Sequence, residues 1–223
     1  MNDDSQLDRV RHLFDDWATR GRAEGMELGH TPTARPAFES LELAPEQRYL
    51  DIGCGNGYTV RWAAAIDPSV QAYGLDAAEK MVARARHLSQ DIDNARFIHA
   101  PFPLPVLKAK SFDAVFSMEV FYYLPDVLWG LLNVFRLLKP GGRFACIVDY
   151  YAENEASHSW PTDVNIPMTL LSAREWREGM EEVGLTVLDQ RRLCPPLSPG
   201  EQPNWKHTEG SLYTLVERPT DAV

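Results

Sequence analysis

The sequence predicts an α/β protein in which a mostly parallel sheet of seven strands, with an antiparallel edge strand, carries helices on both faces. Three observations lead to this fold class. Short apolar segments alternate with amphipathic helical segments from residue 48 to residue 150. A glycine-rich turn follows the first apolar segment directly, as expected where a strand crosses into a helix. Two further apolar segments close the chain as a hairpin-like pair.

The N-terminal segment, residues 1–45, precedes this alternation and is predicted to be helical. Its apolar residues have helical spacing and are followed by a glycine stop: Leu7, Val10, Phe14, Trp17 and Gly21. Residues 21–43 contain several glycines and prolines, which interrupt helices. We therefore expect a link there, with at most one short helix before Pro45.

Residues 46–150 form the predicted core. The expected strands are residues 48–53, 70–76, 95–100, 111–118 and 143–151, and the expected helices are residues 58–66, 77–88 and 125–138. The last helix is expected to bury Val127, Leu128, Leu131, Leu132 and Phe135, and to stop at Pro140. Trp62, Trp129 and Trp176 fall on predicted helix faces and are expected in the core.

The last third of the chain lacks this alternation. Residues 151–171 have no clean period and are predicted to be an inserted loop. Ser172 and Glu175 form a capping-box pattern before a helix that stops at Gly184. Strands at residues 185–192 and 211–217 complete residues 172–223, joined by a proline-rich segment. No internal repeat is present, and we expect a single domain over residues 1–223.

Composition excludes several classes of protein. The formal net charge is −10, with 32 acidic and 22 basic residues, which argues against a broad nucleic-acid-binding face. Three cysteines without paired spacing indicate reduced thiols, and six dispersed histidines indicate no metal site. The acidic N-terminus is unlike a signal peptide, and no apolar run approaches the ~20 residues of a membrane span. We expect a cytoplasmic protein that does not enter a membrane.

The turn "GCGNG" brings three glycines to the end of the first strand, where open α/β sheets bind ligands. Asp76 ends the second strand, and a carboxylate there can accept hydrogen bonds from both hydroxyls of a ribose. Together the two features favour a nucleoside ligand over a plain tight turn with a helix-capping acid. A dinucleotide fingerprint would need glycine where Tyr58 stands, and a P-loop would need Gly-Lys-Ser/Thr, which is absent.

Four stretches in this order and spacing resemble the class I S-adenosylmethionine-dependent methyltransferases. They are "LDIGCGNG" (residues 50–57), "YGLDAAEKM" (residues 73–81), "SFDAVFSMEVFYYLPD" (residues 111–126) and "LLKPGGRF" (residues 137–144). The resemblance spans roughly residues 48–150. It implies a Rossmann-like doubly wound fold, S-adenosylmethionine as cofactor, and an N-terminal lid at residues 1–45.

The resemblance also implies where the cofactor lies. Asp51 would sit near its ammonium group, Asp76 would hold the ribose, and Ala77 and Met81 would pack near the adenine. The family usually has an Asp where Ala100 stands, so adenine recognition here would depend on backbone groups and on Pro101 or Phe102. The implied cofactor-binding set is Asp51, Gly53, Cys54, Gly55, Asn56, Gly57, Asp76, Ala77, Met81, Ala100, Pro101, Phe102, Ser117 and Met118.

No residue stands out as a dedicated catalyst, because methyl transfer depends mainly on alignment of acceptor, methyl group and sulfur. A base is needed only where the acceptor is protonated. Glu119, Tyr122 and His30 are candidates, but Glu119 could instead be a solvated acid at a helix start, Tyr122 a core residue and His30 an exposed loop residue. Residues that could shape the acceptor pocket are Met26, Tyr123, Tyr150, Tyr151, His158, Trp160 and Asn165.

We expect an enzyme that transfers a methyl group to a small molecule by in-line displacement. A non-catalytic module that binds S-adenosylmethionine or another nucleoside is the alternative, since an intact glycine turn shows binding and not turnover. A third hypothesis is an oxidoreductase with a degenerate dinucleotide-binding fingerprint. Tyr58 and the "KPGG" turn argue against it. The pattern does not identify the methyl acceptor.

Overall fold

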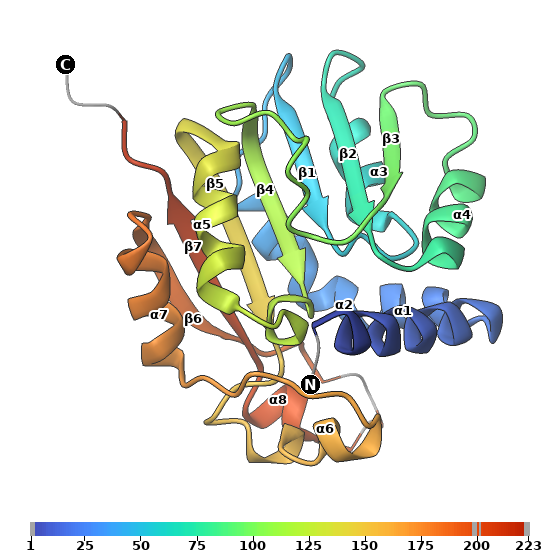
Figure 1. Ribbon diagram of the computed structural model, residues 1–223, viewed down its shortest axis with the longest axis vertical. Helices are drawn as coiled ribbons and strands as arrows, with labels where there is room; N and C mark the ends of the chain where they lie inside the picture. Colours follow the sequence, from blue (N-terminus) through green and yellow to red (C-terminus); the bar gives the residue numbers. More distant parts are fainter. Residues whose placement is uncertain (1–2, 198–199, 201, 221–223) are drawn as a thin grey trace.

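Seven strands pair into one sheet in the computed structural model, which describes residues 3–197, 200 and 202–220 (Figure 1). The strands are β1 (Arg48–Ile52), β2 (Gln71–Asp76), β3 (Ala95–His99), β4 (Phe112–Met118), β5 (Leu138–Val148), β6 (Thr186–Leu193) and β7 (Ser211–Glu217), in the order β3-β2-β1-β4-β5-β7-β6. Strands β1 to β5 all pair in parallel, and β7 is antiparallel to both β5 and β6. The predicted fold class is confirmed, with the antiparallel strand one position in from the edge.

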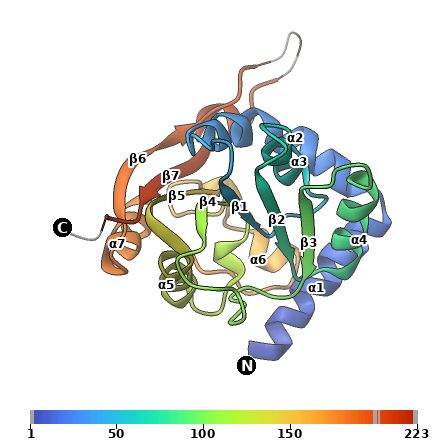
Figure 2. The same cartoon turned by 90° about the horizontal axis from the view of Figure 1, so that it is seen from above.

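Helices cover both faces of this sheet (Figure 2). They are α1 (Asp3–Thr19), α2 (Arg22–Glu39), α3 (Tyr58–Ala64), α4 (Glu79–Leu88), α5 (Val127–Leu137), α6 (Trp160–Asp163), α7 (Ala173–Glu182) and α8 (Trp205–Thr208), with single 3₁₀ turns η1 (Phe121–Tyr123) and η2 (Glu155–Ser157). Helices α2 and α3 pack on one face, and α5 and α7 pack on the other. None of the helices in the described part of the chain has the length and hydropathy of a membrane span.

The predicted link after Gly21 is instead one 18-residue helix, α2, with Pro32 and Pro36 inside it. Each proline removes one backbone hydrogen bond, so propensity alone argues against this helix. Burial outweighs propensity here, because Ala34, Ala37 and Phe38 all pack into the core on one face of the sheet. The prediction of a short, interrupted link was therefore wrong.

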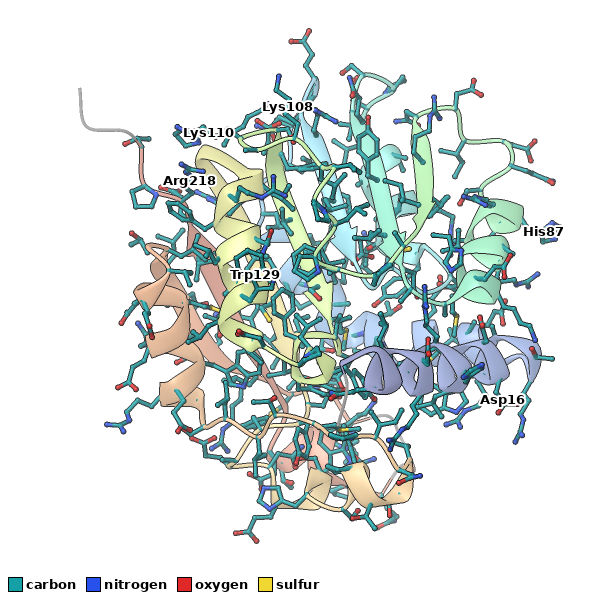
Figure 3. All side chains as sticks on the ribbon, viewed as in Figure 1. Asp16, His87, Lys108, Lys110, Trp129 and Arg218 are labelled. Atoms are coloured by element: carbon teal, nitrogen blue, oxygen red, sulfur yellow. The ribbon has the colours of Figure 1, made fainter. Side chains whose placement is uncertain are left out.

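Helix α5 forms where expected, but its buried face differs from the predicted one. Val127, Leu131 and Val134 are buried against the sheet, whereas Leu128 and Leu132 are each 42% exposed. Trp129 of α5, also expected in the core, is 54% exposed (Figure 3). Gly130 explains this phase, because its missing side chain lets α5 pack closely on Leu124 and Phe121.

The C-terminal third follows the predicted order with added detail. The capping box between Ser172 and Glu175 is present at the start of α7, and Gly184 follows this helix in a left-handed conformation. Within the predicted insert, residues 151–171, the chain forms η2 and α6. Helix α8, in the proline-rich segment before β7, was not predicted. The strand expected at residues 143–151 begins earlier and ends at Val148.

The strand order reverses between β1 and β4, which are neighbours in the sheet but far apart in sequence. Ligands of open α/β sheets bind beyond the carboxyl ends of the strands at such a switch point. At this end of the sheet lie α1 and α2, while Lys108 and Lys110 mark the opposite end (Figures 1 and 3). The fold thus places the two N-terminal helices over the expected ligand position.

Candidate active site

A cavity of about 380 Å³ lies at the switch point, between the carboxyl ends of the strands and the helices α1 and α2. This volume falls within the range of small-molecule sites. Three acids that follow or end strands line it: Asp51, Asp76 and Glu119. None of the described residues that line it is a lysine or an arginine. The cavity therefore suits a ligand that carries positive charge.

Asp76 joins the end of β2 to the glycine turn. One carboxylate oxygen accepts a hydrogen bond from the Gly55 N–H and the other accepts one from the Ala78 N–H, both at 2.8 Å. Burial raises the pKa of Asp76, while these two backbone donors lower it. Each oxygen keeps a further lone pair and Asp76 lines the cavity, so the carboxylate can still accept hydrogen bonds from ligand hydroxyls.

Asp51, in β1, is buried and accepts a hydrogen bond from the Thr59 hydroxyl. Burial is the main cause that raises the pKa of Asp51 to about 7, and the negative charge of Asp76 adds to it. A cationic group in the cavity would reverse this shift. Asp51 is therefore suited to hold an ammonium group.

The three glycines of the turn serve different purposes. All have positive φ angles: 74° at Gly53, 51° at Gly55 and 79° at Gly57. A Cβ atom on Gly53 would lie 2.1 Å from Val120, and one on Gly57 would lie 2.5 Å from Phe97. A Cβ atom on Gly55 would meet no protein atom within 4 Å. Only at Gly55 does the open space lie where a ligand can come close to the backbone.

The N-terminal helices form one wall of the cavity. Leu7, Val10 and Phe14 of α1 line it, as do four α2 residues with helical spacing, Ala23, Met26, Glu27 and His30. Glu27 accepts a hydrogen bond from the Asn56 side chain at 2.7 Å and forms an ion pair with Arg61 at 3.1 Å. A second ion pair joins Glu24 to Arg84 at 2.6 Å. Polar contacts thus fasten α2 to the glycine turn and to α4.

The residues expected around adenine are brought together. Ala77 and Met81, which follow β2, line the cavity, and so do Ala100, Pro101 and Phe102, which follow β3. The side chain of Met81 is buried and packs with Ala23 and Ala78. None of these five residues is an acid that could replace the Asp usual at the position of Ala100. This part of the cavity therefore presents an apolar surface to a flat ring.

The other end of the cavity is apolar and partly aromatic. It is lined by Phe14, Pro103, Val120, Tyr123, Leu124, Pro125 and Trp129. Phe14 and Tyr123 meet edge to face, with ring centroids 5.7 Å apart. Tyr123 in turn packs on Tyr122 at 4.5 Å, and Tyr122 packs on Tyr150 at 5.6 Å. A methyl acceptor at this end would meet rings and aliphatic side chains.

The structure places some predicted residues away from the cavity surface. Gly57, Ser117 and Tyr122 are not among its lining residues, and Ser117 instead donates a hydrogen bond to the Ile52 carbonyl at 2.9 Å. Five candidates for the acceptor pocket also lie outside it: Tyr150, Tyr151, His158, Trp160 and Asn165. Cys54, Gly53, Asn56, Met118, Met26 and His30 do line the cavity.

His30 and Glu119 reach the cavity from opposite sides. Burial, helped by the positive charge of Lys206, lowers the pKa of His30 to about 4, so its imidazole is neutral at physiological pH. Glu119 has a φ angle of 61°, which is rare for a residue with a side chain. Burial and the charge of Asp149 raise the pKa of Glu119. Both side chains are thus available for proton transfer.

Comparison with known proteins identifies the family. Residues 50–146 match the family model of a methyltransferase domain. A solved structure, the complex between the Haloferax volcanii Trm112 methyltransferase activator and the putative methyltransferase, contains a chain 33% identical to this one. The two superpose with a TM-score of 0.84, over 92% of this chain and 97% of the other. The protein belongs to the class I S-adenosylmethionine-dependent methyltransferases.

Two curated relatives of this methyltransferase bear on its chemistry. The 27-O-demethylrifamycin SV methyltransferase of Amycolatopsis mediterranei is 37% identical over 80% of this chain and 66% of its own length. The cycloartenol-C-24-methyltransferase of Arabidopsis thaliana is 32% identical over 61% of this chain, which spans only 43% of that enzyme. The cofactor of this family, S-adenosylmethionine, carries sulfonium and ammonium groups that match the acid-lined cavity.

Sequence reasoning missed several residues of this site. Ala23 and Glu27 were missed, but they share helical spacing with the predicted Met26 and His30, so a search for period 3.6 across the glycines could have found them. Trp129 lines the cavity although it was assigned to the core. Asp149 and Lys206, whose charges act on Glu119, lie 30 and 87 residues further along the chain, and no local pattern connects them to it.

Proposed function

We propose that the methyltransferase acts on a small, largely apolar acceptor without a phosphate group. The observation that carries this proposal is the acceptor end of the cavity, where rings and aliphatic side chains converge and no lysine or arginine is among the described lining residues. Phosphate recognition normally uses such cations. The acceptors named for the relatives, cycloartenol and 27-O-demethylrifamycin SV, are of a compatible kind.

In the proposed complex, each end of the cavity holds one part of the reaction. Asp76 would accept hydrogen bonds from the ribose, the backbone at Gly55 would pass beneath the cofactor, and Asp51 would face its ammonium group. S-adenosylmethionine supplies an electrophilic methyl group on a sulfonium. The apolar walls at the other end would exclude water and align the acceptor with that methyl group, which is the main source of rate in such a displacement.

A panel experiment tests this function. The purified protein is incubated with S-adenosylmethionine and separate sets of sterols, phenolic polyketides, isoprenoid alcohols, isoprenoid diphosphates and peptides, and release of S-adenosylhomocysteine is measured. We expect turnover with an unphosphorylated apolar set. Turnover confined to diphosphates, peptides or added RNA would contradict the proposal.

Trp129→Ala provides a matched variant, because this exposed side chain lies at the acceptor end and not among the residues proposed to hold the cofactor. It should raise KM for the acceptor about tenfold or more, as expected when an aromatic contact with the bound acceptor is lost. The affinity for S-adenosylmethionine should stay within about twofold. Equal losses of affinity for the acceptor and for S-adenosylmethionine would show that Trp129 does not act on the acceptor alone.

We also propose a protein partner of the Trm112 activator type, supported by the likeness to the chain in the Haloferax volcanii complex. Co-expression with a tagged Haloferax volcanii Trm112, followed by size-exclusion chromatography at low and high salt, tests it. Elution as one complex supports the partner. Separate elution at both salt concentrations contradicts it, and leaves the acceptor proposal unaffected.

A further inference from the structure

Two acids lie side by side beneath the acceptor end of the cavity. Glu119 follows β4 and Asp149 follows β5, the neighbouring parallel strand, so the sheet itself brings them together. One oxygen of the Glu119 carboxyl group accepts a hydrogen bond from the Asp149 N–H at 2.5 Å, and the other accepts one from the Tyr122 hydroxyl at 2.7 Å. Glu119 faces the cavity, and Asp149 lies behind it, only 3% exposed.

Negative charge exceeds positive charge around Glu119 and Asp149. Burial raises the pKa of both carboxyl groups, and the charge of Asp149 raises that of Glu119 further. Lys206 of α8 is the cation that acts on both, and Ser211 hydrogen-bonds Asp149. The Asp149 Oδ1 atom is buried without a partner among the described residues. The other titratable groups coupled to Glu119 are neutral: Tyr58, Tyr122, Tyr123 and Cys146.

Two buried carboxyl groups on neighbouring strands, one of them bonded to the backbone N–H of the other residue and with one nearby cation, are most stable when only one of them is ionised. The cofactor changes this balance, since S-adenosylmethionine carries a sulfonium charge that S-adenosylhomocysteine lacks. Both molecules are proposed to bind in the same cavity, and Glu119 lines that cavity. A cation that enters favours the fully ionised pair, and its loss favours the singly protonated pair.

We propose that Glu119 and Asp149 release one proton when S-adenosylmethionine binds, and that Glu119 accepts a proton from the methyl acceptor during transfer. The second step rests on the proposed function. The acceptor X–H forms an X–CH₃ bond with the electron pair of its X–H bond or a lone pair of X. The electrons of the C–S bond stay on sulfur, which becomes a neutral thioether, and the proton passes to the Glu119 carboxylate.

The charge of the two carboxyl groups then follows the charge on the cofactor's sulfur before and after methyl transfer. The pair carries two negative charges opposite the sulfonium and one opposite the neutral thioether. His30 is the competing proton acceptor, but its pKa of about 4 makes it a much weaker base near neutral pH. Glu119 also has the better support, since two hydrogen bonds hold its carboxyl group, whereas no hydrogen bond to the His30 side chain is found among the described residues.

Calorimetry in two buffers tests the first step without any acceptor. Binding of S-adenosylmethionine and of S-adenosylhomocysteine is measured in phosphate and in Tris at pH 7.0, and the dependence of the heat on the buffer's ionisation enthalpy gives the protons released. We expect S-adenosylmethionine to release up to about one more proton than S-adenosylhomocysteine. Equal proton numbers in the wild-type protein would overturn the proposal.

Two variants locate the proton. Glu119→Gln keeps the shape of the side chain and should abolish the difference, because Asp149 alone stays ionised beside Lys206. Asp126→Asn is the matched control, since this exposed acid lines the same cavity and asparagine caps α5 equally well. It should retain the difference. A difference that survives in Glu119→Gln would overturn the assignment.

A pH series covers the case in which Glu119→Gln fails to fold. In the wild-type protein, the preference for S-adenosylmethionine over S-adenosylhomocysteine should rise with pH by up to about tenfold per unit while the pair titrates. A flat ratio between pH 6 and pH 9 overturns the first step. Neither measurement contains an acceptor, so a failed acceptor panel would leave the result intact.

The second step is tested with an acceptor from the panel. Glu119→Gln should lower kcat by about 100-fold or more, the usual contribution of a proton-transfer group, with KM for the acceptor little changed. The residual rate of this variant should no longer depend on pH over the range in which the wild-type rate rises. An unchanged kcat would overturn the role of Glu119 as proton acceptor.

Discussion

The carboxylate of Asp76 accepts a hydrogen bond from the Gly55 N–H at 2.8 Å, so the acid at the end of β2 fixes the turn that follows β1. One residue thereby faces the expected position of the ribose and holds the backbone over which the cofactor lies. Substitution of each residue should weaken cofactor binding for a different reason.

Asp76→Ala should weaken S-adenosylmethionine binding by at least about tenfold. A charged acceptor of two ribose hydroxyls contributes ~1.5–3 kcal/mol for each hydrogen bond, and the turn also loses its anchor. Titration calorimetry measures the loss, and urea unfolding shows how much stability changes. Asp76→Asn, which retains one acceptor oxygen, should lie between the two proteins. Unchanged affinity in Asp76→Ala would refute the ribose assignment.

Gly55→Val should abolish cofactor binding and leave the fold largely intact. Its side chain would project into open space, where no protein atom lies within 4 Å. The φ angle of 51° adds a backbone strain of about 1–2 kcal/mol, which a domain of ordinary stability tolerates.

Gly21→Val is the matched control for that strain. Gly21 has a φ angle of 70° and equally open surroundings, but it lies between α1 and α2 and outside the cavity lining. Circular dichroism and titration calorimetry should show similar stabilities for the two variants and wild-type affinity only in Gly21→Val. Retained binding in Gly55→Val would mean that the ligand lies elsewhere.

Residues 7–30 should exchange backbone amides rapidly in the free protein and slowly with S-adenosylhomocysteine bound. Each partly exposed ion pair that holds α2, such as Glu24 with Arg84, contributes only about 0.2–1 kcal/mol, so ligand contacts can decide the position of the lid. Hydrogen–deuterium exchange by mass spectrometry is the measurement. If protection rises only at residues 53–57 and at Asp76, the N-terminal helices are static and His30 is no site residue.

The free protein should lose stability as pH rises from about 4 to about 7, and Asp51 should account for part of this loss. Its folded-state pKa of about 7 lies above the ordinary aspartate value of 3.8, so the folded state holds the proton more tightly. Asp51 does not change the free energy of unfolding at pH values below both pKa values. Above pH 7 its ionisation lowers that free energy by on the order of a few kcal/mol.

Asp51→Asn keeps an acceptor for the Thr59 hydroxyl and removes the titration. Urea unfolding at pH 5 and pH 8 should therefore show a smaller difference for this variant than for the wild-type protein. Saturating S-adenosylhomocysteine, whose ammonium group would face Asp51, should reduce the wild-type difference as well. A variant with the full wild-type dependence on pH would show that Asp51 is already ionised when the cavity is empty.

The parts of the structure that were predictable from sequence carry a local signal. A strand such as β1 is a short apolar run, and the glycines and Asp76 follow their strands at fixed spacing. Helix α2 gave the opposite signal, since Pro32 and Pro36 disfavour it and only its burial against the sheet stabilises it. The phase of α5 also depends on a tertiary contact, the close packing at Gly130.

The acceptor end of the site was least predictable for the same reason. Glu119 could be proposed from its place after β4, but its properties depend on Asp149, Tyr122 and Lys206. Asp149 and Lys206 come from two other segments, and each looks ordinary in its own sequence context. Tyr122 lies in the core although it was a candidate for the site, because η1 turns Tyr123 toward the cavity instead.

Helix α2 is continuous, and this has a consequence for how molecules enter and leave. Its first half lines the cavity, while Ala34, Ala37 and Phe38 in its second half are fixed in the core. Gly21, with its left-handed backbone, is then the point about which α1 alone can swing away. Helix α1 touches both ends of the site, through Asp15 to the Lys80 N–H and through Gln6 to the Tyr123 carbonyl. A displacement of α1 would break both contacts together, so we expect cofactor and acceptor to exchange in random kinetic order.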